Sequence, residues 1–261
     1  MNDKVIVITG ASDGIGAALA RELVKRNAKG IVLAARREAE LATLAKELGP
    51  TAFPVVTDVT KRADVVRLVA KTIEKFGRLD VMVNNAGRGI SRLPSELTDE
   101  DIDDMITVNL KSVVYGIQAV LPQMHQQKSG QIITISSGLA RFPFAAIRSA
   151  YAASKAAVNL LMGTLRQELR GSGIHATTVM PGVVATEFGN NALHGGADSR
   201  NLPGAQPVGE VATVIADVIE KPVAECYTRP QMRDMAAAYF SAEDVGALEG
   251  KPPFFIPVPR A

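Results

Sequence analysis

Short apolar runs alternate with longer amphipathic segments from the first residues of the chain, and this alternation is the strongest constraint on its fold. The apolar runs, rich in Val and Ile, are predicted strands and span residues 5–9, 30–34, 52–56, 79–83, 131–135 and 174–179. The segments between them have a helical period and span 16–26, 38–48, 63–76, 99–121 and 150–169. This order predicts the α/β class, with a doubly wound parallel sheet and helices on both of its faces.

The chain of 261 residues has the length of one α/β domain, and we expect a single domain over residues 1–261. Glycine, asparagine and proline gather at 189–207, which predicts a flexible loop. A domain linker is disfavoured there because too little chain follows to form a second core. The proline-rich end, 251–261, is predicted to lie extended over the surface.

The charges of the chain nearly balance, because 29 basic and 27 acidic side chains give a net charge of +2. No stripe of Lys and Arg interleaved with aromatic residues occurs, so we expect neither a nucleic-acid nor a membrane partner. One cysteine excludes an intrachain disulfide, and three widely separated histidines predict no metal site. Without a signal-peptide pattern or an apolar run of roughly 18 residues, the sequence predicts a soluble, cytoplasmic protein.

An acidic cluster at 99–104 follows Thr98, and Asp101 stands at the third position of the predicted helix. This is the pattern of a capping box, in which the Thr side chain and the later acidic side chain satisfy each other's backbone N–H groups. Acidic residues are also favourable near the positive end of the helix dipole. The cluster is therefore interpreted as a helix N-terminus rather than as a metal site.

A glycine-rich turn connects the first predicted strand to the first predicted helix, with Gly10, Gly14 and Gly16 in the pattern Gly-x-x-x-Gly-x-Gly. Glycines let the backbone approach a pyrophosphate closely, and the helix that follows directs its free N–H groups and positive dipole end at that anion. The alternative is a tight turn that needs glycines for its conformation alone.

The second predicted strand ends beside two arginines, Arg36 and Arg37. In a dinucleotide-binding fold this strand end lies next to the adenosine ribose, where an acidic residue binds the 2′-hydroxyl and an arginine pairs with a 2′-phosphate. The arginines therefore favour NADP(H), with NAD(H) possible, whereas Asp13 in the glycine-rich turn opposes a phosphate nearby. The alternative is that both arginines only solvate the start of the next helix.

Tyr151 is followed four residues later by Lys155, so that both side chains lie on one face of the predicted helix. A nearby ammonium stabilises a phenolate and lowers the tyrosine pKa, which makes the hydroxyl usable in proton transfer. Ser137 ends one strand and Asn85 ends another, and the carboxyl ends of parallel strands lie along one edge of the sheet. We therefore expect these residues to converge with the glycine-rich turn.

In combination the motifs resemble the short-chain dehydrogenase/reductase family over roughly residues 4–190, which implies a Rossmann-like fold. The glycine-rich turn resembles the family's cofactor loop, and the segments around Asp58, Asn85 and Pro181 match further cofactor motifs. Together with the two arginines, the expected cofactor-binding residues are Gly10, Ser12, Gly14, Ile15, Gly16, Arg36, Arg37, Asp58, Val59, Asn85, Ala86, Gly87, Tyr151, Lys155, Pro181, Gly182, Val184 and Thr186.

The resemblance implies an NADP(H)-dependent oxidoreductase that interconverts a ketone or aldehyde and an alcohol by hydride transfer. In that family Tyr151 would be the acid/base, Ser137 would polarise the substrate oxygen, and Lys155 would lower the tyrosine pKa and hold the ribose. Asn109 would position a proton-relay water. The interval between Ser137 and Tyr151 is 14 residues, about one more than expected of the family, so Ser136 is an alternative for the serine role.

The substrate pocket is less constrained by the sequence. Leu139, Phe142, Phe144 and Phe188 are candidates for lining an apolar pocket, and the alternative for these side chains is packing beneath a loop. The end of the chain, from residue 225, lacks the glycine-rich last strand that is usual in the family. We expect a small-molecule carbonyl or alcohol substrate and a homodimer or homotetramer; an epimerase of this family and a non-catalytic cofactor-binding sensor or scaffold are the competing functions.

Overall fold

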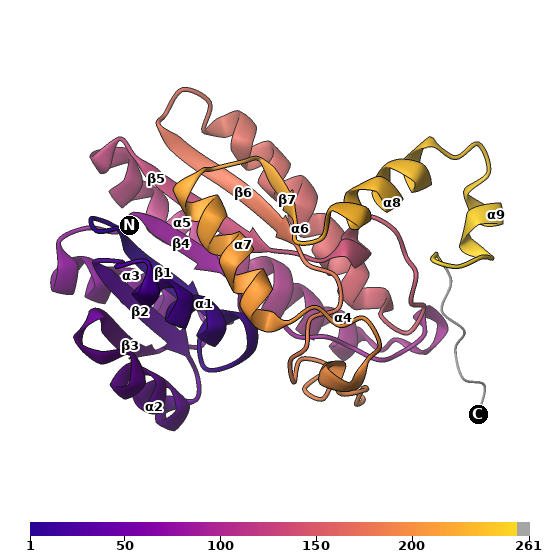
Figure 1. Ribbon diagram of the computed structural model, residues 1–261, viewed down its shortest axis with the longest axis horizontal. Helices are drawn as coiled ribbons and strands as arrows, with labels where there is room; N and C mark the ends of the chain where they lie inside the picture. The colour runs from indigo at the N-terminus through magenta and orange to yellow at the C-terminus, as the bar shows by residue number, and fades with distance from the viewer. Residues whose placement is uncertain (255–261) are drawn as a thin grey trace.

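In the computed structural model, which describes residues 1–254, the first two thirds of the chain form one parallel sheet that the last third extends (Figure 1). The strands are β1 (Val5–Thr9), β2 (Gly30–Ala35), β3 (Ala52–Val56), β4 (Val81–Asn84), β5 (Gly130–Ile135), β6 (Ile174–Met180) and β7 (Glu225–Tyr227). Their order is β3-β2-β1-β4-β5-β6-β7, and every neighbouring pair is parallel. The predicted fold class and its six strands are confirmed, and β7 is a seventh strand that the prediction omitted.

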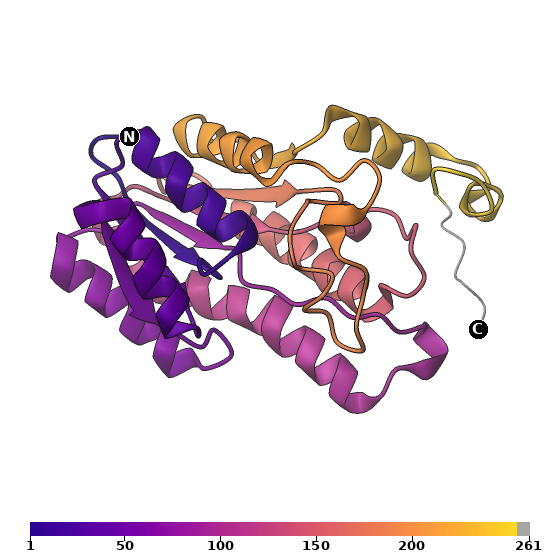
Figure 2. The ribbon, with the colours of Figure 1, turned by 60° about the horizontal axis from the view of Figure 1, so that its bottom comes forward.

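Two layers of helices cover the sheet (Figure 2). One layer consists of α1 (Gly14–Lys25), α2 (Glu38–Leu48) and α7 (Val208–Glu220), and the other of α3 (Arg62–Phe76), α5 (Ser112–Gln127) and α6 (Ser149–Glu168). Alternate residues of a strand point to opposite faces, so Ile6 and Ile8 of β1 join the first layer while Val7 joins the second. This two-sided burial is why the strands are apolar nearly throughout.

The helix predicted at 99–121 is interrupted in the structure and ends later than predicted. α4 (Asp99–Ile106) gives way to a π-helical segment, Thr107–Lys111, before α5 begins, and α5 continues through Pro122 to Gln127. The capping box of Thr98 and Asp101 is confirmed at the start of α4. A π-helical turn inserts a residue into the helix and rotates its side chain out of the regular pattern. Asn109 lies in this segment.

The last part of the chain forms a separate apolar cluster beyond β7, made by α8 (Pro230–Ser241) and α9 (Val245–Glu249), which project to one side of the sheet in Figure 1. Phe142 is 1% exposed and packs there against Met232, Ala236 and Phe254. Of the predicted extended tail, 255–261 lies outside the described residues; 251–254 forms turns that bury Phe254.

The sheet reverses its order between β1 and β4, and polar contacts of Thr9 connect these two strands. The buried Thr9 hydroxyl donates to the carbonyl of Val83 at 3.2 Å and accepts from the backbone N–H groups of Asn85 at 3.0 Å and Ala86 at 3.1 Å. The side-chain amide of Asn85 donates in turn to the carbonyls of Thr9 and Gly10 at 2.9 and 3.2 Å. In an open α/β sheet, ligands bind in the crevice at such a reversal.

We predict that Thr9→Val lowers the free energy of unfolding by about 1–3 kcal/mol, because the partly buried N–H of Ala86 loses its hydroxyl acceptor and the buried hydroxyl bond to Val83 is lost. Urea denaturation measures the change. Thr43→Val is the matched control, because Thr43 is exposed on α2 and its replacement should change stability by no more than about 0.5 kcal/mol. Equal losses for both variants would contradict a special role for Thr9.

Candidate active site

A cavity of about 830 Å³ runs along the carboxyl edge of the sheet. It extends from Arg36 and Asp58, which follow β2 and β3, past the glycine-rich turn after β1, to Ser137 and Pro181, which follow β5 and β6. Its length along the sheet edge suits an extended ligand that crosses several strands, such as a dinucleotide. Of the residues that the sequence predicts to bind the cofactor, all except Gly16 line this cavity.

The glycine-rich turn has the geometry that close approach of a pyrophosphate requires. Gly10 has a positive φ of 65°, and a Cβ atom there would lie 2.9 Å from the Cα of Ala86. Gly16 packs behind the turn, where a Cβ atom would overlap the carbonyl oxygen of Gly10. Asp13, the N-cap residue of α1, makes no side-chain capping bond, so the first N–H groups of this helix are available to an anion. The turn therefore fits a dinucleotide pyrophosphate.

The two arginines at the adenosine end of the cavity have different surroundings. Arg37 is held by the hydroxyl of Ser12 at 2.8 Å and by an ion pair with Asp13. Arg36 is exposed and lines the cavity, and no hydrogen bond or ion pair within residues 1–254 involves its side chain. Arg36 is consequently the cation of this pair that can respond to a ligand without first losing a partner.

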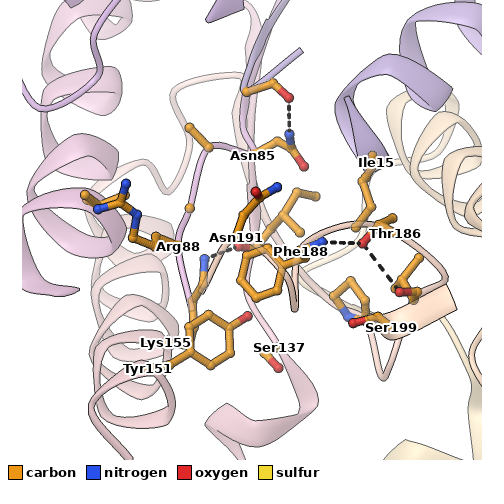
Figure 3. Close-up of a pocket in the computed structure, with 18 of the residues that line it drawn as sticks. Ile15, Asn85, Arg88, Ser137, Tyr151, Lys155, Thr186, Phe188, Asn191 and Ser199 are labelled. Atoms are coloured by element: carbon orange, nitrogen blue, oxygen red, sulfur yellow. Dashed lines mark hydrogen bonds between the residues drawn. The ribbon is translucent and has the colours of Figure 1, made fainter. Parts of the chain in front are cut away.

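The other end of the cavity brings together Ser137, Tyr151 and Lys155 (Figure 3). The hydroxyl of Ser137 lies beside that of Tyr151 and accepts a hydrogen bond from the backbone N–H of Leu139 at 3.2 Å. The ammonium of Lys155 donates to the carbonyl of Ile135 at 2.8 Å. The alternative serine, Ser136, directs its hydroxyl instead to the backbone carbonyl of Lys155 at 3.3 Å. The geometry therefore favours Ser137 over Ser136 as the partner of Tyr151.

Burial dominates the protonation of both ionisable groups. It raises the pKa of Tyr151 to about 12, against the opposing effects of the Ser137 hydroxyl and of the positive charge of Arg148. Burial also lowers the pKa of Lys155 to about 8. Desolvation of the phenolate is the largest effect on the Tyr151 pKa, and Lys155 is not among the groups that shift it. The lowering of this pKa by Lys155 stays a prediction.

Asn109 lies behind the cavity in the π-helical segment and is fully buried. Its amide oxygen accepts from the backbone N–H of Arg88 at 2.9 Å, and its amide nitrogen donates to the carbonyl of Arg88 and to the hydroxyl of Ser154, both at 3.0 Å. The Ser154 hydroxyl donates to the carbonyl of Tyr151 at 2.7 Å. Both amide hydrogens thus have protein acceptors, and the side chain links the segment after β4 to α6.

Three of the four apolar substrate candidates line the cavity: Leu139, Phe144 and Phe188. The ring of Phe188 lies 5.6 Å from that of Tyr151, measured between centroids. Phe142 does not line it, because its ring packs at 5.4 Å from that of Phe254 in the C-terminal cluster. Phe142 is therefore a packing residue and not a pocket residue. Helix α8 also reaches the site, where Met232 contacts Gly138 and Gly182.

The segment predicted as a flexible loop, 189–207, covers the substrate end of the cavity and supplies Asn191 and Ser199 to its lining. His194 contacts Asp101 of α4 at 2.6 Å, and this contact is the main reason that the pKa of Asp101 falls to about 2. The backbone of Leu193 bonds to Gly89 and Ser91 at 2.9 and 3.0 Å. The loop is thus attached to two segments that are distant in the sequence.

The sequence did not identify four polar residues that line the cavity: Arg88, Asp104, Arg148 and Asn191. Arg88 forms an ion pair with Asp104 at 3.3 Å and points away from Tyr151 in Figure 3. Two signals could have identified the arginines: Arg88 directly follows a cofactor motif, and Arg148 stands three residues before Tyr151.

No helix within residues 1–254 has the length and apolar character needed to cross a membrane.

The lowered pKa of Lys155 predicts a pH-dependent stability. Between pH 8 and the ordinary lysine value of 10.5, the unfolded chain holds the Lys155 proton that the folded protein has lost. Rising pH therefore favours folding in this range. Below pH 8 the folded protein bears the full free-energy cost of burying the Lys155 charge, and this cost disappears as the ammonium loses its proton. Relative to Lys155→Met, the wild type should gain up to about 3 kcal/mol of unfolding free energy from pH 7 to pH 10.5.

Urea denaturation of both proteins across this pH range measures the difference. Because all other groups are shared, their titration cancels between the wild type and Lys155→Met. A difference that does not change with pH would mean that Lys155 titrates normally in the folded protein.

Comparison with known proteins agrees with this geometry. The sequence profile of the family described as short chain dehydrogenase matches residues 4–195. An uncharacterized oxidoreductase of Staphylococcus saprophyticus is 43% identical over 190 residues, which cover 71% of this chain and 80% of that protein.

Two solved structures are similar over most of the chain. A serine dehydrogenase complexed with NADP+ superposes with a TM-score of 0.80 at 28% identity and covers 85% of this chain and 93% of its own. A short chain dehydrogenase/reductase from Burkholderia phymatum in complex with NAD gives a TM-score of 0.85 at 26% identity and covers 95% of each chain. This chain therefore belongs to the short chain dehydrogenase family and is an oxidoreductase.

Proposed function

We propose that the protein is an NADP(H)-dependent oxidoreductase that interconverts a ketone or aldehyde and the corresponding alcohol. The observation that supports this most directly is the grouping of Ser137, Tyr151 and Lys155 at one end of a cavity whose middle is the glycine-rich turn. Such a cavity holds a dinucleotide along the sheet edge and a small substrate beside the tyrosine. A protein that merely bound the cofactor would have no need of a buried Tyr and Lys at this position.

Tyr151 is the proposed acid/base. Its raised pKa keeps the hydroxyl protonated at neutral pH, which is the form that donates a proton to the oxygen of a carbonyl substrate. Ser137, beside it, would donate a hydrogen bond to the same oxygen and so fix the substrate carbonyl. When bound, the nicotinamide supplies the hydride donor or acceptor for the substrate carbon.

Lys155 and Asn109 are proposed to support this pair in different ways. The buried ammonium of Lys155 bonds to Ile135 and retains two further N–H donors for the cofactor ribose. Because the amide hydrogens of Asn109 both reach protein acceptors, we propose that this residue also has a positioning role; its expected contact with a relay water stays a prediction. It fixes α6, and with it Tyr151, against the segment after β4.

The preference for NADP(H) is proposed from Arg36. Its guanidinium is exposed at the adenosine end of the cavity, whereas Arg37 is already engaged by Asp13 and Ser12. A planar guanidinium suits a phosphate because it offers two parallel hydrogen bonds as well as charge. The similar serine dehydrogenase contains NADP+, and the similar Burkholderia protein contains NAD, so NAD(H) is the alternative cofactor.

A homo-oligomer formed through α4, α5 and α6 is also proposed. Ile102 on α4 is 45% exposed and Leu160 on α6 is 76% exposed, so both helices present a large apolar side chain to solvent. A shallow apolar groove lined by Leu97, Met105 and Ala153 lies between α4 and α6. Burial of these side chains against a second copy would stabilise a dimer.

We predict that Tyr151→Phe lowers kcat for carbonyl reduction by at least about 100-fold and leaves NADPH affinity within about twofold, because only the proton donor is lost. Steady-state kinetics and fluorescence titration with NADPH measure the two quantities. Tyr115→Phe is the matched control, since Tyr115 lies on α5 beneath Arg62 and outside the cavity. Substantial turnover by Tyr151→Phe would reject the assignment, and cofactor binding without turnover by the wild type would favour the sensor or scaffold.

We further predict that Arg36→Ala weakens NADPH binding by about 10-fold or more and changes NADH binding little, since only NADPH has a 2′-phosphate for the guanidinium. Parallel fluorescence titrations give both dissociation constants. Arg67→Ala, which removes an exposed arginine of α3, is the control and should alter neither. Equal weakening of both cofactors would show that Arg36 does not contact the phosphate.

A further inference from the structure

Arg148 lies at the substrate end of the cavity and has no role in the proposed chemistry. It is the N-cap residue of α6, three positions before Tyr151, and its side chain lines the cavity with those of Phe144, Ile147 and Phe188. Its positive charge is close enough to Tyr151 to lower the pKa of that hydroxyl. The guanidinium is therefore near the position where the substrate oxygen reacts.

No carboxylate in the described part of the chain, residues 1–254, pairs with this guanidinium. The ion pairs within residues 1–254 engage Arg88 with Asp104 and Arg200 with Glu187, but none includes Arg148. One of its N–H groups donates to the carbonyl of Ile90 at 3.2 Å. A guanidinium has five N–H donors, so up to four remain for a ligand.

The surroundings make this charge unfavourable while it is unpaired. Burial lowers the pKa of Arg148, which shows that the protein has removed water from the group without supplying an acid. The Cβ position of Gly89 is 3.2 Å from one terminal nitrogen and that of Gly196 is 3.2 Å from the other, so two segments enclose the guanidinium closely. Structural arginines in such places are normally paired with a carboxylate.

We propose that Arg148 binds the carboxylate of the substrate, which makes the substrate a compact hydroxy- or oxo-acid with an apolar remainder. This inference rests on the proposed oxidoreductase function. The planar fork of the Arg148 guanidinium matches a carboxylate, and the remaining substrate atoms would contact Leu139, Phe144 and Phe188. The cofactor phosphates are not the expected ligand, because they are assigned to the glycine-rich turn and to Arg36, whereas Arg148 lies close to Tyr151 at the other end of the cavity.

The test compares an acid with its neutral ester, using full-length protein and NADP+. β-Hydroxybutyrate and α-hydroxyisocaproate are assayed beside their methyl esters. The wild type should show at least about tenfold higher kcat/KM for the preferred acid than for its ester. Arg148→Met should lower kcat/KM for the acid about 100-fold and leave that for the ester within a fewfold.

Arg148→Lys is the matched variant, because it keeps the charge and loses the planar fork, and it should retain an intermediate preference for the acid. A purely structural role of Arg148 in holding Ile90 would lower acid and ester rates alike in Arg148→Met, and this result would overturn the proposal. So would equal rates on acid and ester in the wild type.

A binding measurement separates this inference from the proposed function. With NADP+ present, isocaproate should raise the melting temperature of the wild type but not that of Arg148→Met, and the neutral isocaproamide should raise neither. Stabilisation by isocaproate without turnover of any alcohol would retain the carboxylate site and reject the oxidoreductase. Turnover of esters without stabilisation by isocaproate would retain the oxidoreductase and reject the carboxylate site.

Discussion

The hydroxyl of Thr9 holds together the two strands between which the sheet reverses its order, and the rest of the site depends on this contact. It fixes the backbone of Asn85 and Ala86 directly after β4, and the Asn85 amide fixes the carbonyl of Gly10 in return. The glycine-rich turn is thereby placed at a defined height above the sheet edge. The backbone pairing of β1 with β4 ends at Ile8 and Val83, so the Thr9 contacts fix the two chain segments just beyond the paired residues.

Further polar contacts connect the segment after β4 to Tyr151. From Asn85 the chain reaches Arg88, whose backbone N–H and C=O both bond to Asn109, and Asn109 bonds to Ser154, which bonds to the carbonyl of Tyr151. The π-helical segment is what brings Asn109 into this path. Buried polar groups are costly unless all are paired, so a network of this kind admits few alternative arrangements. The relative placement of turn and tyrosine follows from it.

Much of this could be predicted from residues alone, because the relevant signals are local. Val and Ile runs separated by amphipathic segments specify strands and helices, and the spacing of Tyr151 and Lys155 on one helix specifies a shared face. Helix α7 was omitted although Val211, Ile215, Val218 and Ile219 carry a clear helical period. The three-residue strand β7 is too short and too polar to leave a pattern.

The sequence by itself determined six of the strands, their parallel arrangement and the motifs that gather at one edge, since each depends on spacing along the chain. Only the tertiary structure decided the environment of those residues. Phe142 became core because α8 and Phe254 pack on it, and Tyr151 and Lys155 have shifted pKa values because neighbouring elements exclude water. Arg148 forms no ion pair with any acidic side chain of residues 1–254. Burial and charge pairing depend on residues far apart in the chain, and local pattern carries no information about them.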